Sequence, residues 1–158
     1  MIYLKNRQRK YTIDQEKMKS SLELILKLLK YEDFDISLWF TNNATIKAYN
    51  RDFRGKDKAT DVLSFPYQDV QAGKRIRKGS PEDQNLGDLL ISVEYIDKQL
   101  QEKKAAHLEA TLEKHLVKLI VHGICHLLGY DHIEDQDWVR MRAKEGWLLK
   151  KLKEQNLF

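Results

Sequence analysis

The sequence has little cysteine, little proline and no long apolar run, and each absence excludes a class of protein. One Cys among 158 residues cannot form an internal disulfide, which excludes a disulfide scaffold and favours a reducing, cytoplasmic compartment. Two Pro and seven Gly are too few for a collagen-like or disordered chain. No apolar run approaches the roughly 18 residues of a membrane span, and residues 1–15 hold no apolar stretch of signal-peptide length. We therefore expect no membrane partner.

The chain does contain enough apolar material for one folded domain. Hydrophobic residues make up 42% of it, and a chain of this length can bury a full core without disulfides. Nothing repeats and no linker divides the sequence, so we expect a single domain over residues 1–158. Lys and Arg outnumber Asp and Glu by 28 to 24, and this excess permits a polyanionic partner without demonstrating one.

The apolar pattern predicts strands mainly in the first part of the chain and helices in the last. Strands are predicted at Ile2–Leu4, Asp35–Thr41, Val62–Phe65 and Gly87–Val93. Helices are predicted from a capping box at Thr12–Gln15 to about Leu29, from Asn42 or Asn43 to about Asn50, and over Glu94–Lys104, Leu108–Leu128 and Asp135–Lys153. We expect loops at Arg51–Thr60 and Gln68–Asn85, and we expect the second to be mobile. This segregation favours an α+β fold in which a small mixed sheet packs against helices.

The segment that carries chemistry is HGICHLLGYDH at 122–132. On a helix, His122 and His126 lie four residues apart on one face and can bind one ion together. Gly129 suits the left-handed conformation that ends a helix, so the chain can turn back and bring His132 to the same ion. Three imidazoles suit zinc or a neighbouring transition metal, and three protein ligands leave a position for water, as in catalytic sites. A lone His pair means little, but the third histidine at the spacing of an extended zincin motif predicts a metal site.

The motif departs from zincin peptidases at one position. Those enzymes carry Glu, their general base, directly after the first His, whereas this chain has Gly123. Because the sequence keeps the three candidate metal ligands but lacks this general base, it argues against a peptidase. Cys125 is turned about 100° from His126 around the helix, which favours a buried thiol over a fourth ligand. Asp131 either orients a ligand or a water molecule, or belongs only to the turn, and the sequence leaves both open.

A second constellation is the basic loop that starts at Arg54. Arg54, Lys56 and Lys58 alternate with Gly and Asp, so some of them can face one phosphate. Arg is the better bidentate phosphate clamp, although the composition of this segment alone favours a solvated loop. The further basic residues at 74–78 are more simply explained as a flexible surface. Those along the C-terminal helix are more simply explained as the polar side of an amphipathic helix.

Together these segments resemble the YbeY family, the bacterial endoribonucleases of ribosomal RNA maturation. The resemblance rests on HGICHLLGYDH at 122–132, RGKDKATDVLSFP at 54–66 and NLGDLLIS at 85–92. Their order and spacing agree, so the resemblance covers nearly the whole chain. Ala59 stands where many relatives have Pro, which affects the rigidity of the loop. The 68–85 segment carries no family motif.

The resemblance implies a central metal-bearing helix within the α+β fold. It implies a single-strand-specific, metal-dependent endoribonuclease of 16S rRNA 3′-end maturation and ribosome quality control. Its partners would be single-stranded RNA, ribosomal RNA and the small ribosomal subunit, with no DNA. His122, His126 and His132 match the family's metal ligands, with one zinc per chain the usual assignment, and Arg54 matches its functionally important arginine.

The resemblance also suggests how the parts would act. The ion would polarise a phosphodiester oxygen or supply a hydroxide, and Arg54 would stabilise the charge growing on the phosphate. Asp131 and the hydroxide are both candidates for the general base.

Two other functions stay open on the sequence alone. The first is a ribosome-assembly factor that binds RNA and holds a structural zinc, which a fourth protein ligand would favour. The second is a metallohydrolase of another substrate, which would need an Asp or Glu from elsewhere in the chain to reach the water on the metal.

Overall fold

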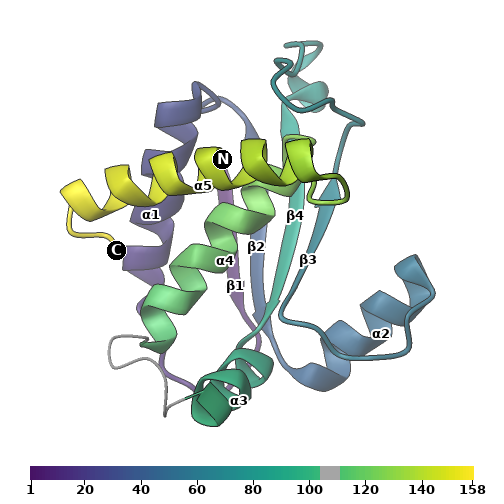
Figure 1. Cartoon of the computed structure of the whole chain (residues 1–158), viewed down its shortest axis with the longest axis vertical. Helices are drawn as coiled ribbons and strands as arrows, with labels where there is room; N and C mark the ends of the chain where they lie inside the picture. Colours follow the sequence, from purple (N-terminus) through teal and green to yellow (C-terminus); the bar gives the residue numbers. More distant parts are fainter. Residues whose placement is uncertain (104–110) are drawn as a thin grey trace.

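The computed structural model describes residues 1–103 and 111–158, and in this part of the chain the strands form one mixed sheet. The strands, which lie in the order β1-β2-β4-β3, are β1 (Ile2–Asn6), β2 (Asp35–Thr41), β3 (Val62–Pro66) and β4 (Asn85–Ser92). β1 and β4 both run parallel to β2, and β3 pairs with β4 in the antiparallel direction. The predicted α+β class and small mixed sheet are therefore confirmed (Figure 1).

Helices cover the sheet mainly on one face. The described helices are α1 (Gln15–Leu29), α2 (Asn43–Arg54), α3 (Val93–Lys103), α4 (Leu112–Leu127) and α5 (Asp135–Glu154), with a 3₁₀ turn at Pro81–Asp83. Figure 1 shows α1, α4 and α5 on the near side of the sheet and α2 projecting beyond β3. None of the described helices combines the length and the apolar composition that crossing a membrane requires.

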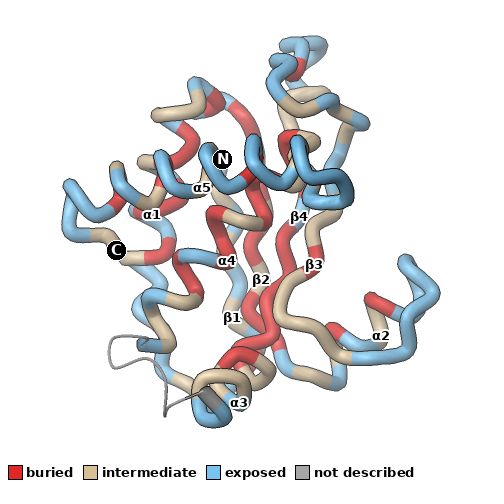
Figure 2. The backbone as a smooth tube through the Cα atoms, viewed as in Figure 1, coloured by how far each residue is buried: buried red, intermediate tan, exposed pale blue. Residues whose placement is uncertain are grey.

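The core lies between the sheet and the covering helices. Ile36, Leu38 and Phe40 alternate along β2 and are no more than 1% exposed. They belong to one apolar cluster with the buried sides of α1 and α4, and Figure 2 shows buried backbone concentrated in β2, β4 and α4. Leu63 and Leu90 belong to a second, smaller cluster with residues of α2. The sheet thus supports α4 firmly on one face and the start of α2 on the other.

The predicted cap of α1 is wrong. Asp14 caps this helix, because its Oδ1 accepts a hydrogen bond from the backbone N–H of Lys17 at 3.0 Å. Thr12 lies two residues too early, since the helix begins at Gln15.

The predicted end of α2 is also wrong. The helix continues through Arg54, so the segment from Arg51 to Arg54 is helical and not part of a loop. Gly55 is the residue that ends it, with a φ of 67° in the left-handed region that glycine adopts most easily. Arg54 is therefore the last residue of a helix, and the helix holds its backbone more firmly than a loop would.

Other boundaries differ by a few residues. β1 extends to Asn6 because it pairs with β2 as far as Phe40. The predicted helix end at Lys104 and helix start at Leu108 lie outside the described residues. Within the described residues, α4 begins at Leu112, after Thr111, whose side chain caps it.

The 68–85 segment has an apolar anchor that its composition does not reveal. Ile76 is 4% exposed, and its backbone N–H donates to the Tyr31 hydroxyl at 3.1 Å. Lys78 pairs with Asp33 at 2.6 Å. These contacts tie the segment to the turn after α1, and its mobility stays a prediction.

Candidate metal centre

Helix α4 places two of the three predicted ligands side by side. Its buried side carries the residues Leu116, Val117, Ile120, Val121 and Ile124, which pack into the main core. His122 and His126 lie at the margin of this side and remain half-buried. Their Nε2 atoms are 3.1 Å apart. The four-residue spacing of the helix therefore brings two ring nitrogens to one point, as predicted.

The turn after α4 brings in the third histidine. Gly129 has a φ of 81°, and the Tyr130 N–H donates to the Cys125 carbonyl oxygen at 3.0 Å, which closes the helix end. The turn is also tightly packed, because a Cβ on Gly129 would lie 1.9 Å from the Val70 carbonyl oxygen. The His132 ring centroid lies 5.7 Å from that of His122. The predicted role of Gly129 as the helix terminus is confirmed.

Asp131 stabilises this turn. Its Oδ1 accepts a hydrogen bond from the backbone N–H of His132 at 2.7 Å. The carboxylate thus fixes the backbone that carries a predicted ligand, and it also lines the cleft described below. This contact makes Asp131 part of the turn, and a further role in orienting a ligand or a water molecule stays a prediction.

The three histidines fit a metal ion by the chemistry and spacing of their nitrogens. One ring nitrogen from each of His122, His126 and His132 lies within 4.8 Å of the other two. Tetrahedral bonds of about 2.0–2.1 Å from imidazole nitrogens to zinc require nitrogens about 3.3 Å apart, close to the 3.1 Å of the first pair. Burial, and then the neighbouring rings of His122 and His132, lower the pKa of His126. His126 is therefore kept in the neutral form that binds metals.

Gly123 shows why a peptidase-type base is missing. This residue is buried, and a Cβ added to it would lie 2.7 Å from Leu89 Cδ2 and 3.3 Å from Ser64 Oγ. The position faces the sheet and has no room for a glutamate. Cys125 is also fully buried, and burial raises the pKa of its thiol to about 12, so the group stays protonated. The burial predicted for this thiol is confirmed, and its exclusion as a fourth ligand stays a prediction.

A further polar residue of the site, Glu145, was not predicted. Its Oε1 lies 2.7 Å from Nδ1 of His122, and it reaches the site from α5, 23 residues further along the chain. The sequence signal that could have indicated Glu145 is its spacing from the apolar residues of α5. Met141, Leu148 and Leu152 form the buried stripe of α5, and position 145 falls on the same side of that helix. A carboxylate on an apolar stripe is a sign of a specific partner.

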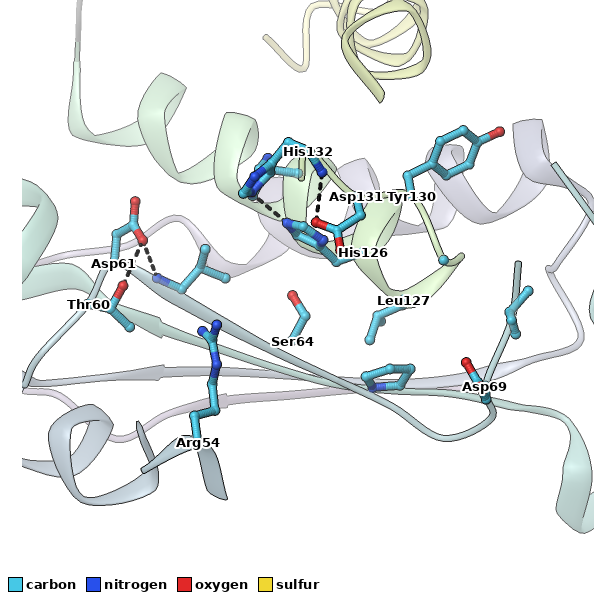
Figure 3. Close-up of a pocket in the computed structure, with 15 residues that line it drawn as sticks. Arg54, Thr60, Asp61, Ser64, Asp69, His126, Leu127, Tyr130, Asp131 and His132 are labelled. Atoms are coloured by element: carbon cyan, nitrogen blue, oxygen red, sulfur yellow. Dashed lines mark hydrogen bonds between the residues drawn. The ribbon is translucent and has the colours of Figure 1, made fainter. Parts of the chain in front are cut away.

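Arg54 faces the histidines across a cleft of about 550 Å³. The three histidines and Gly129–Asp131 line one side, and Arg54, Thr60, Asp61 and Ser64 line the other. Figure 3 shows the Arg54 side chain pointing from the end of α2 into this space, toward the side where His126 and His132 lie. The sequence-predicted site residues are therefore brought together at one cleft.

The charge of Arg54 is free to meet a ligand. No carboxylate among residues 1–103 and 111–158 pairs with it, whereas Arg51, one turn earlier, pairs with Asp52 at 2.8 Å. Lys56 and Lys58 do not line the cleft. Asp61 lies near Arg54 in the cleft, and its Oδ1 accepts the Val62 backbone N–H at 2.8 Å.

Comparisons with known proteins identify the family of this chain. The family model described as endoribonuclease YbeY matches residues 3–153. The chain is 38% identical over 165 residues to the endoribonuclease YbeY of Clostridium botulinum (strain Langeland), covering 95% of this chain and 96% of that protein. It is 36% identical over 167 residues to the endoribonuclease YbeY of Clostridium perfringens (strain ATCC 13124), covering 96% of each.

A solved structure shares the fold. The solution structure of TM1509 from Thermotoga maritima superposes with a TM-score of 0.58 at 24% identity, covering 99% of this chain and 95% of that one. This likeness concerns the fold alone. The family match over 3–153, with relatives above one-third identity over nearly their whole length, shows that this chain belongs to the YbeY endoribonuclease family.

Proposed function

We propose that this protein cleaves single-stranded RNA with the help of one zinc ion, and that its substrate in the cell is the 3′ end of 16S rRNA on the small ribosomal subunit. Membership in the endoribonuclease family makes it a nuclease that hydrolyses RNA phosphodiester bonds. One observation carries the proposal further: an arginine with no ion-pair partner in the described part of the chain lies across one cleft from three clustered imidazoles. That combination suits a phosphate better than a peptide or a sugar.

The residues of the cleft have distinct roles in this proposal. His122, His126 and His132 would hold the ion, which when bound supplies Lewis-acid polarisation of the phosphodiester and a water of lowered pKa. Arg54 binds a non-bridging phosphate oxygen and stabilises the charge that grows on it during cleavage. Because a guanidinium can donate two parallel hydrogen bonds, it also orients the phosphate.

Two carboxylates of the cleft are suited to accept the proton of the attacking nucleophile. Asp61 and Asp131 each use Oδ1 to accept a neighbouring backbone N–H, which fixes the side chain. The second oxygen of each makes no hydrogen bond to any residue that the structure describes. A fixed carboxylate with a free oxygen can act as a general base.

The preference for single strands follows from the chemistry of RNA. Unpaired segments are flexible and can splay out their bases, whereas a duplex keeps its bases stacked inside a rigid A-form helix. A cleft that clamps phosphate without reading bases would bind such a segment through its backbone. A ribosomal substrate also places the protein in the cytoplasm with the ribosome.

The alternatives receive less support. A structural zinc has four protein ligands. Among the described residues, only three side chains that could bind a metal ion gather here, and they lie beside an open cleft. A peptidase would need a base where Gly123 packs against the sheet.

The direct test combines metal analysis with cleavage of defined RNAs. Purified protein should contain about one zinc per chain and cut a single-stranded oligonucleotide while leaving the same sequence intact in a duplex. His126→Ala should lose both the metal and the cleavage. Metal-loaded protein that cuts no RNA, or that cuts the duplex equally well, would refute the proposal.

A further inference from the structure

We propose that Glu145 is a positioning residue of the metal centre, which holds the His122 ring so that its Nε2 faces the ion. This inference rests on the metal-dependent function proposed above. It assigns a role to a residue of α5, an element outside the two motifs that define the site.

The contact itself is short and partly shielded from water. Glu145 Oε1 lies 2.7 Å from His122 Nδ1, and the two side chains are only 22% and 31% exposed. An ionised carboxylate can only accept hydrogen bonds, so Nδ1 must be the protonated nitrogen. The lone pair of His122 is then on Nε2, the atom that lies 3.1 Å from Nε2 of His126. One contact thus sets both the tautomer and the direction of the ring.

The position of Glu145 in α5 shows that fold stability does not explain it. Met141, Leu148 and Leu152 on the same side of α5 are 2%, 0% and 0% exposed. An apolar side chain at 145 would continue this stripe, whereas a carboxylate must give up water. Among residues 1–103 and 111–158, His122 is the one hydrogen-bond partner of the Glu145 side chain. Because Leu148 and Leu152 belong to the main core, they fix the position of α5, and this holds the Glu145 carboxylate against the His122 ring.

Glu145 also differs from the other carboxylates near the site. Asp131 binds a backbone N–H, and no other carboxylate in residues 1–103 and 111–158 pairs with a ring nitrogen of His122, His126 or His132. A carboxylate behind a ligand imidazole fixes the ring and makes it a stronger donor, and losing such a partner typically weakens metal binding about 10–100-fold.

The experiment measures metal affinity rather than activity. Glu145→Met keeps the size of the side chain and removes the acceptor, whereas Glu145→Gln keeps an acceptor for the Nδ1–H and removes the charge. Zinc affinity, measured by competition with a chromogenic chelator, should fall about 10–100-fold in Glu145→Met and by less in Glu145→Gln. The visible absorption of the Co²⁺-loaded protein should change in the same order. Glu154→Gln, on the exposed side of the same helix, is the matched control and should bind zinc like wild type.

A merely structural role predicts the opposite pattern. Glu145→Met would then lower the melting temperature of the metal-free protein and leave the zinc affinity and the Co²⁺ spectrum at their wild-type values, which would overturn the proposal. A measurement on the wild type gives an independent decision. Nitrogen-detected NMR of the metal-free protein should show His122 protonated at Nδ1, and protonation at Nε2 would overturn the proposal.

These readouts separate this inference from the proposed function. Wild-type protein that binds zinc but cleaves no RNA would refute the function, while the affinities of the Glu145 variants would still decide the role of this residue. Protein that binds no zinc would overturn both.

Discussion

At the scale of single residues, Arg54 is the part of the site that would act through both its charge and its bidentate guanidinium. It has no ion-pair partner among the described residues, and it lines the cleft from the last position of α2. Arg51 on the same helix is equally basic but is paired with Asp52 and does not line the cleft. The two arginines therefore form a natural pair for comparison.

We expect Arg54→Ala to reduce the cleavage rate at saturating single-stranded RNA about 100-fold, since removing one preorganised hydrogen-bond donor to the developing charge typically costs that much. Arg54→Lys should recover only part of the loss, because a point charge replaces a bidentate fork. Metal content should stay unchanged, and the free energy of unfolding should stay within about 0.5 kcal/mol of wild type. Arg51→Ala is the control. Equal cleavage rates for the two alanine variants would remove Arg54 from the mechanism.

Cys125 gives a second prediction at this scale. It is fully buried, and burial raises the pKa of the thiol to about 12, so below that pH the reactive thiolate is scarce. We expect the folded protein to react with iodoacetamide far more slowly than the urea-unfolded protein, across pH 6–9. Equal labelling rates in the two states would show that Cys125 is accessible, and would reopen its exclusion as a ligand.

At the scale of elements, the turn after α4 is the feature on which the third ligand depends. Gly129 and Gly55 both adopt positive φ, at 81° and 67°, and both end a helix. They differ in their surroundings, because a Cβ on Gly129 would collide with the Val70 carbonyl oxygen whereas one on Gly55 would meet nothing within 4 Å.

We expect Gly55→Ala to cost about 1–2 kcal/mol of unfolding free energy, the cost of the left-handed conformation. Gly129→Ala should cost at least about 3 kcal/mol, because overpacking adds to that strain. It should also weaken zinc binding, since His132 follows the turn. Urea denaturation and chelator competition measure the two effects. Equal losses of stability in both variants would mean that the contact with Val70 relaxes freely.

The elements also show what the sequence could predict. The helix with His122 and His126 and its glycine terminus were predictable, because ligand spacing and helix ending are local properties of the chain. The pairing of β3 with β4 was not predictable from alternation, which gives the faces of a strand but not its neighbours. Glu145 was missed because its contact with His122 joins residues 23 positions apart, on two different helices. Only its place on an apolar stripe indicated a role.

At the scale of the whole molecule, the candidate metal centre lies beside the core and not within it. The main cluster joins buried apolar residues of β2, β4, α1, α4 and α5, whereas the three histidines keep exposed surface. His132 is exposed, and the other two are half-buried. The fold therefore has a source of stability that is independent of the ion, unlike small zinc domains that unfold without metal.

We expect removal of zinc by a chelator to lower the melting temperature without unfolding the protein at 25 °C. A ligand at about 1,000 times its Kd stabilises by about 4 kcal/mol, which for a chain of this size corresponds to roughly 10 °C. The far-ultraviolet circular dichroism of the metal-free protein should stay close to that of the loaded protein, because the buried cluster makes no use of the ligands. Re-addition of zinc should restore both the melting temperature and the cleavage of RNA. Cooperative loss of the helical signal on chelation would instead indicate a structural zinc, and would favour the assembly-factor alternative over the nuclease mechanism.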